Sequence, residues 1–136
     1  MNDIDQFLKC QKVAVAGAST NRNKYGNKVV RAFLQNAREV IPINPNEDRV
    51  EGLAAVTSVS QLPDDVEAIS IVTPPAVTLQ VVAAALEKNI RYIWMQPGAE
   101  NPEAVAMARN AGANVIADGA CVLVALGYRE MESPVV

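Results

Sequence analysis

The chain alternates short apolar runs with longer stretches in which apolar residues recur every three or four positions. The short runs are nearly continuous, which is typical of strands that are buried on both faces of a parallel sheet. They occupy residues 13–16, 38–45, 67–72, 91–95 and 115–117. Between them, spacings such as Val29, Val30 and Phe33 indicate helices that bury one face.

The predicted helices fill every connection except the one after the second strand. That connection is polar, contains Gly52, and holds one helical turn at residues 58–61 that Pro63 ends. Pro42 lies inside the second strand, which predicts that this strand is incompletely paired or lies at an edge of the sheet. Another short amphipathic helix is expected before the first strand.

Five strands that alternate with helices predict an α/β fold with a Rossmann-like, doubly wound, mostly parallel five-stranded sheet. Right-handed crossovers restrict the topology, and we expect the strand order 3-2-1-4-5. A length of 136 residues suits one domain. Residues 1–136 are therefore predicted to form a single domain, with a leading helix in residues 1–11 and a frayed tail at residues 129–136.

A glycine turn follows the first strand. Gly17, Ala18 and Ser19 come directly after it, and helical spacing begins at Gly26. A helix N-terminus presents free N–H groups and the positive end of the helix dipole, so this unit favours an anion site. The alternative is an ordinary turn without a ligand. In such sheets, ligands bind beyond the carboxyl ends of the strands, and we expect a site there.

Charge and composition exclude several classes of function. The net charge is −3 and no basic run is present, so neither nucleic acid nor an acidic membrane surface is an expected partner. No apolar stretch approaches the roughly 20 residues of a membrane span. Cys10 and Cys121 match no metal spacing, and no export signal precedes them, which predicts reduced thiols and a cytoplasmic location. The chain has no histidine, which excludes Ser–His and Cys–His pairs and histidine metal ligands.

Two signals of dinucleotide binding are altered. The G-x-G-x-x-G fingerprint is not complete, because Ser19 follows where a second glycine is needed and the next glycine is Gly26. At the end of the second strand, Asn44 and Pro45 stand where an acid would hold the ribose. A hydride-transfer function is therefore the weaker interpretation.

Four segments together resemble a known family. They are VAVAGAS with a later K-x-G, IPINP, IVTPP, and IWMQPGA followed by A-x-x-A-G. The set is similar to the small prokaryotic CoA-binding proteins, whose single domain resembles the CoA-binding domain of the succinyl-CoA synthetase α subunit. The resemblance covers residues 12–126 and implies coenzyme A, free or acylated, as the ligand.

The resemblance also implies binding residues in four loops. The loop after the first strand would meet the CoA phosphates, the second would lie beside the adenosine, and the last two would line the nucleotide and the pantetheine arm. The implied residues are Gly17, Ala18, Ser19, Arg22, Lys24, Gly26, Asn44, Pro45, Val72, Thr73, Pro74, Pro75, Gln96, Pro97 and Gly98.

Simpler roles exist for several of these residues. Lys24 can be a solvated lysine, Pro74 and Pro75 can merely end a strand, and Gln96 can satisfy a backbone group. Cys121 stands at the start of the last predicted helix. It could form a mixed disulfide with the CoA thiol, although a small buried side chain is the favoured interpretation.

Catalysis does not follow from the resemblance. Succinyl-CoA synthetase uses a phosphohistidine in a second domain and a partner subunit, whereas this chain has no histidine. No catalytic residues and no metal site are predicted. We expect a stand-alone CoA- or acyl-CoA-binding protein, with a homodimer or an unidentified protein as its partner. The alternatives are an NAD(P)-binding oxidoreductase or redox-sensing domain, and a ligase subunit that is active only with a partner chain.

Overall fold

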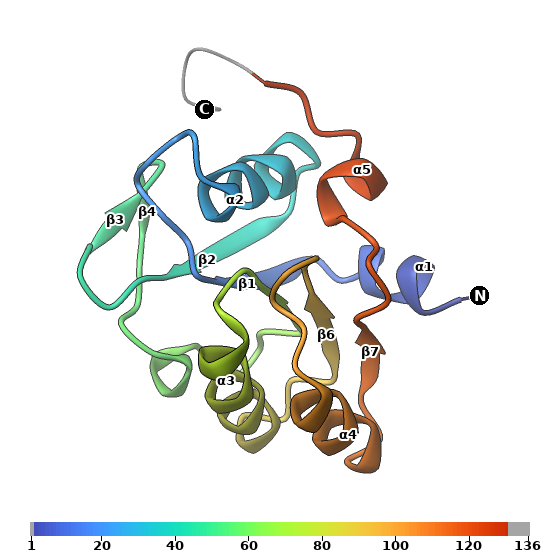
Figure 1. Ribbon diagram of the computed structural model, residues 1–136. Coiled ribbons are helices and arrows are strands. Elements are labelled where there is room, and N and C mark those ends of the chain that lie inside the picture. Colours follow the sequence, from blue (N-terminus) through green and yellow to red (C-terminus); the bar gives the residue numbers. More distant parts are fainter. Residues whose placement is uncertain (1, 131–136) are drawn as a thin grey trace.

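A five-stranded sheet forms the centre of the computed structural model, which describes residues 2–130 (Figure 1). The expectation for the tail falls, from residue 131 onward, outside the described residues. All neighbouring strands of the sheet are parallel. The strands are β1 (Lys12–Ala16), β2 (Glu39–Ile43), β5 (Ala68–Ile71), β6 (Tyr92–Met95) and β7 (Asn114–Ile116).

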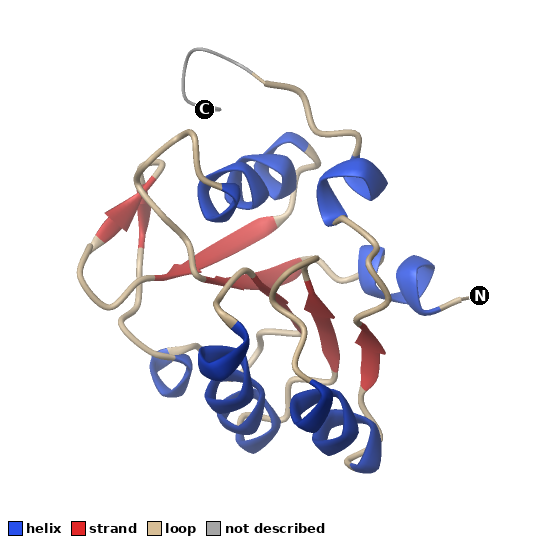
Figure 2. Cartoon of the chain, in the orientation of Figure 1, coloured by secondary structure: helices blue, strands red, loops and turns tan. Residues whose placement is uncertain are grey.

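Helices cover both faces of the sheet (Figure 2). One face carries α1 (Asp3–Leu8), α2 (Tyr25–Gln35) and α5 (Val122–Leu126). The other carries α3 (Pro75–Glu87), α4 (Pro102–Asn110) and the 3₁₀ helix η1 (Val59–Gln61). A hairpin of β3 (Arg49–Val50) and β4 (Leu53–Ala54) lies beside β2.

The continuous apolar runs are explained by burial on both faces. In β1, Val13 and Val15 join the core under α1 and α2, whereas Ala14 and Ala16 join the core under α3 and α4. Pro42 lies in an edge strand, as its position in the sequence predicts. Among residues 2–130, no helix has both the length and the apolar character that a membrane span requires.

The expected strand order is wrong. The sheet runs β2-β1-β5-β6-β7, which is 2-1-3-4-5 for these five strands, so the third strand lies beside the first rather than beyond the second. The connection from β2 to β5 crosses the opposite face from α2, where η1 packs against α3. A right-handed crossover on that face carries the chain back past β1. Connections therefore diverge between β1 and β5, which is where ligands bind in such sheets.

Candidate functional site

Three adjoining cavities lie at the carboxyl ends of β1, β2, β5 and β6. The central cavity, of about 630 Å³, is bounded by the turn after β1, the start of α2 and the end of β5. It shares Gly17 and Thr73 with an apolar cavity of about 430 Å³, and Tyr25 and Val72 with a small cavity of about 270 Å³. The three cavities thus adjoin one another at these shared residues, and we refer to them together as the crevice.

Two glycines allow the walls of the central cavity to approach closely. Gly17 has φ +87°, and a Cβ there would lie 2.3 Å from the carbonyl oxygen of Val72. A Cβ on Gly26 would lie 1.9 Å from the carbonyl oxygen of Gly17. No other residue type fits either position, since such contacts would displace backbone. The start of α2 therefore packs directly on the turn after β1.

The N-terminus of α2 is open to the central cavity. Its N-cap, Lys24, makes no side-chain capping bond, and the first turn contains no acidic residue. The first N–H groups of a helix have no partner within it, and together they favour an anion. Within residues 2–130, the Lys24 side chain forms no ion pair or hydrogen bond, and it lines the same cavity. The arrangement can bind a phosphate group.

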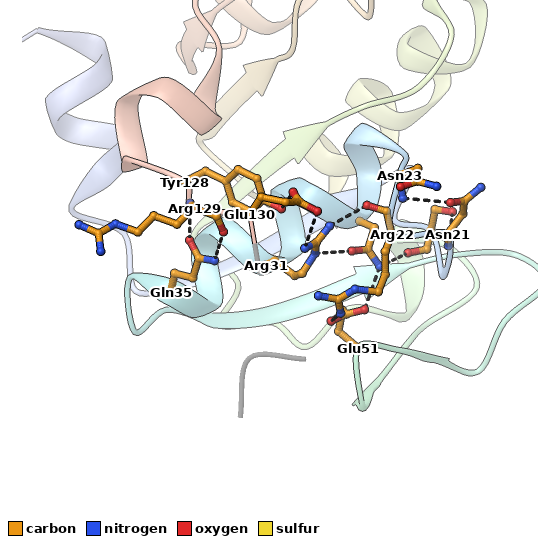
Figure 3. Close-up of polar contacts among 11 residues, drawn as sticks. Asn21, Arg22, Asn23, Arg31, Gln35, Glu51, Tyr128, Arg129 and Glu130 are labelled. Carbon is orange, nitrogen blue, oxygen red and sulfur yellow. Dashed lines mark hydrogen bonds and ion pairs between the residues drawn. The ribbon is translucent and has the colours of Figure 1, made fainter. Parts of the chain in front are cut away.

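Short polar contacts fix the loop between Ser19 and Lys24. Ser19 Oγ accepts a hydrogen bond of 3.0 Å from the Asn21 amide, and Asn21 Oδ1 accepts one of 3.0 Å from the Asn23 amide. Arg22 forms an ion pair of 2.5 Å with Glu51 of the β3–β4 turn (Figure 3). The loop is thus held in shape by the protein's own groups.

Two predicted amide residues have structural partners. Asn44 donates to the carbonyl of Ala18 at 2.9 Å, and its Oδ1 accepts from the amides of Asn46 and Glu47. Gln96 accepts from the amide of Val122 at 2.8 Å and donates to Cys121 Sγ at 3.3 Å. Both side chains therefore hold cavity walls together, which for Gln96 is the simpler of its two expected roles.

The crevice collects most of the residues expected to bind. The central cavity is lined by Gly17, Ala18, Ser19, Lys24, Gly26, Asn44, Val72, Thr73 and Pro74, the apolar cavity by Pro45, and the small cavity by Gln96 and Pro97. Arg22, Pro75 and Gly98 are not brought to these walls. Arg22 turns to Glu51, Pro75 begins α3, and Gly98 lies in the loop after β6.

Sequence reasoning missed other lining residues. Asn23 and Tyr25 flank Lys24, and Tyr25 is 62% exposed between the central and small cavities. An exposed aromatic next to Lys24 and Gly26 was an available signal. The apolar cavity had no local signal, because its wall forms only where η1 meets α3. Its further residues include Ser58, Ser60, Val77, Gln80 and Val81.

The two cysteines lie in different surroundings. Cys121 is half-buried and faces the small cavity. Cys10 is buried before β1, and that burial, reinforced by the nearby Glu67 carboxylate, raises the pKa of its thiol to about 11. No cluster of three or more potential metal ligands occurs in the described part of the chain.

Comparisons with known proteins identify a matching family and several relatives. A family model described as a CoA binding domain matches residues 11–127. The uncharacterized protein YneT of Bacillus subtilis is 28% identical over 124 residues, which are 90% of this chain and 91% of YneT. A solved structure of a conserved hypothetical protein from Pyrococcus furiosus is 43% identical, with a TM-score of 0.80 over 85% of this chain and 98% of that one.

A larger relative matches over only part of its length. The α subunit of ADP-forming acetate–CoA ligase II from Pyrococcus furiosus is 30% identical over 91 residues. These residues are 66% of this chain but 20% of the subunit. The shared region is thus one part of a much longer protein.

Proposed function

The chain belongs to the CoA binding domain family, and we propose that it binds coenzyme A, free or acylated, in the crevice without catalysing a reaction of its own. The observation that carries this proposal is the uncapped N-terminus of α2 beside Lys24, whose side chain has no partner among residues 2–130. A diphosphate needs donors and positive charge at one place, and the central cavity offers both.

The order of the cavities suits the order of groups in coenzyme A. The diphosphate would lie in the central cavity, where Lys24 and the first N–H groups of α2 can donate to it. The adenosine would occupy the apolar cavity, whose walls include Ile43, Val77 and Val81. The pantetheine arm would run past Tyr25 to the small cavity at Gln96, Pro97 and Cys121.

The lining of the crevice supports binding rather than catalysis. Among residues 2–130, Lys24 is the one charged side chain that lines the three cavities. General acid–base catalysis needs a group that exchanges a proton near neutral pH within reach of the substrate, usually a histidine or carboxylate. The described part of the crevice offers Lys24, amides, hydroxyls and the Cys121 thiol, and this lining supports the proposal of binding without catalysis.

The alternatives predict different ligands or partners. An NAD(P)-dependent function is disfavoured, because Asn44 stands where an acceptor for the ribose is needed and its amide is engaged. The proposal includes a protein partner, either a second copy of this chain or an unidentified protein. The similarity to a ligase α subunit supports the second possibility. A cytoplasmic location is likewise part of the proposal.

Ligand screening tests this function. Native mass spectrometry of fresh protein detects retained CoA, and thermal unfolding is then compared with CoA, acetyl-CoA, NAD and NADP. A ligand at 100 times its Kd adds about 2.7 kcal/mol of stability. We expect CoA or acetyl-CoA to stabilise the protein and NAD to leave it unchanged. Stabilisation by NAD alone would overturn the proposal, and co-purification of a ligase chain would replace it with the partner-dependent alternative.

A further inference from the structure

A buried arginine lies directly behind the loop between Ser19 and Lys24, which we call the phosphate loop. Arg31, in α2, is fully buried, and burial of a guanidinium is unfavourable unless its donors are satisfied. Its Nε donates to Asn27 Oδ1 at 2.7 Å, and its Nη2 donates to the carbonyl oxygen of Arg22 at 2.6 Å (Figure 3). Arg31 thus binds the backbone at the middle of this loop.

Asn27 and Glu51 hold the beginning of the same loop. The Asn27 side chain, also fully buried, donates to the carbonyl oxygen of Ser19 at 2.8 Å and to Glu51 Oε2 at 3.1 Å. The Glu51 side chain is only 6% exposed and pairs with Arg22 on its other oxygen. Glu51 has φ +50°, a conformation that is unfavourable for a residue with a side chain. The β3–β4 turn accepts this conformation and places the carboxylate beneath the loop.

We propose that Arg31, supported by Asn27 and Glu51, is a positioning residue for the diphosphate site, an inference that rests on the proposed CoA function. Carbonyl oxygens that faced the central cavity would repel a diphosphate. The carbonyls of Ser19 and Arg22 are instead bonded to Asn27 and Arg31, neither of which lines that cavity. The loop can then offer Lys24 and the N–H groups of α2.

The same arginine links the loop to the C-terminal segment 128–130. Arg31 Nη1 pairs with Glu130 at 3.3 Å, and its guanidinium lies 5.5 Å from the centre of the Tyr128 ring. Gln35 exchanges two hydrogen bonds with the backbone of Arg129, of 2.6 and 3.0 Å, which fastens the segment along α2 (Figure 3). Changes in this segment should therefore reach the phosphate loop although it lies outside the crevice.

Affinity measurements test the positioning role. Arg31→Lys keeps the charge but loses the planar fork that serves Asn27 and the Arg22 carbonyl together, and we expect CoA to bind about tenfold more weakly in calorimetric titrations. Arg38→Lys is the matched control. Arg38 also donates to backbone carbonyls, of Asn36 and Leu8, but at the far end of α2, so its replacement should leave CoA affinity unchanged.

A milder variant keeps the test decisive if Arg31→Lys does not fold. Glu130 is exposed over 59% of its side chain, so Glu130→Gln removes the ion pair without opening a cavity. We expect this variant to weaken CoA binding about two- to threefold. Unchanged affinity in every folded variant at Arg31 and Glu130 would overturn the proposal.

Two further readouts separate positioning from general stability. In a double-mutant cycle, Arg31→Lys is combined with Lys24→Ala. If Arg31 acts through the loop, Arg31→Lys weakens CoA binding less in the Lys24→Ala background than in the wild type. If Arg31 is merely structural, the fold-losses in CoA affinity of the two single variants multiply in the double variant. Without any ligand, amide hydrogen exchange at residues 19–24 should be faster in Arg31→Lys, while exchange in β6 stays unchanged. If wild-type protein binds no CoA, the proposed function fails. The exchange rates then still decide whether Arg31 holds the loop, and equal rates reject it.

Discussion

Charged side chains have different partners at the two ends of the parallel strands, which we call the amino edge and the carboxyl edge of the sheet. At the amino edge, Lys12 lies between Glu39 and Asp65 at 3.1 and 2.8 Å, and Lys88 pairs with Asp64 at 2.9 Å. Glu67 there accepts hydrogen bonds from the backbone of the strand start. At the carboxyl edge, Lys24 has no partner within residues 2–130, and the N-terminus of α2 is uncapped.

This contrast supports the carboxyl edge as the place of the proposed ligand site. Exposed ion pairs are screened by water, so the amino edge gains little stability from its pairs. These pairs do give Lys12 and Lys88 carboxylate partners at that edge. The carboxyl edge keeps its positive groups beside a cavity of about 630 Å³, where an anion can supply the missing partner. We therefore expect the ligand at the carboxyl edge, where Lys24 and the N-terminus of α2 lie beside that cavity.

The largest effect is expected from Gly26→Ala. The new Cβ would lie 1.9 Å from the carbonyl oxygen of Gly17, so the turn that forms the phosphate site must move. We expect a loss of about 1–3 kcal/mol in urea unfolding and loss of CoA binding in calorimetry. Gly112→Ala is the control, because no heavy atom outside its immediate chain neighbours lies within 4 Å of its Cβ position and only backbone strain at φ +80° remains. Wild-type CoA affinity in Gly26→Ala would contradict the geometry of the site.

Charge reversal at one lysine of each edge gives the next effect. A charge-assisted hydrogen bond contributes about 1.5–3 kcal/mol, so Lys24→Glu should weaken CoA binding by about 10- to 150-fold without loss of folding. Lys12→Glu, at the amino edge, should leave CoA affinity unchanged. Equal losses in both variants would mean that net charge, rather than the site, controls binding.

The cysteines allow a smaller comparison of the same edges. With the pKa of Cys10 raised to about 11 by burial, about one thiol in a thousand is ionised at pH 8, and the side chain is shielded as well. Cys121 faces the small cavity and should react first with a thiol reagent. CoA should slow that reaction, and Cys121→Ser should leave only the slow thiol. Faster labelling of Cys10 would refute the assignment.

The smallest effect concerns pH and the amino edge. The hydrogen bond from Lys12 lowers the pKa of Asp65, and the bonds to Asp65 and Glu39 raise the pKa of Lys12. The contribution of Asp65 to the free energy of unfolding is present above its pKa in the unfolded chain, about 3.9. It disappears as pH falls through the lower pKa that Asp65 has in the folded protein. The Lys12 contribution is present below about pH 10.4 and disappears as pH rises through the folded value. Lys12→Met should therefore slightly flatten the pH dependence of the urea unfolding midpoint at both low and high pH, whereas Lys24→Met should leave that dependence unchanged.

The elements of the fold could be predicted because each is encoded locally. Apolar runs gave the five strands, and the spacing of residues such as Val29 and Phe33 gave the helices. The strand order could not be obtained this way. It depends on the face that the connection after β2 crosses, and that face is set by the packing of η1 on α3.

The walls of the candidate site could be predicted in part. Glycines and prolines at strand ends indicated the crevice, and Lys24 indicated its charge. Arg22 is a loop cation like Lys24, but its side chain pairs with the carboxylate of Glu51, 29 positions away in the chain, and so does not line the cavity. Arg31 was not predicted either, because its partners come from the loop, from Asn27 and from Glu130. Burial of a charged residue depends on such distant partners.

Amide chemical-shift mapping with CoA tests the difference between the edges most directly. The account predicts shifts at residues 17–26, 72, 73 and 96, and none at Lys12, Glu39 or Asp65. Absence of shifts at saturating CoA, or shifts centred on the amino edge, would contradict it.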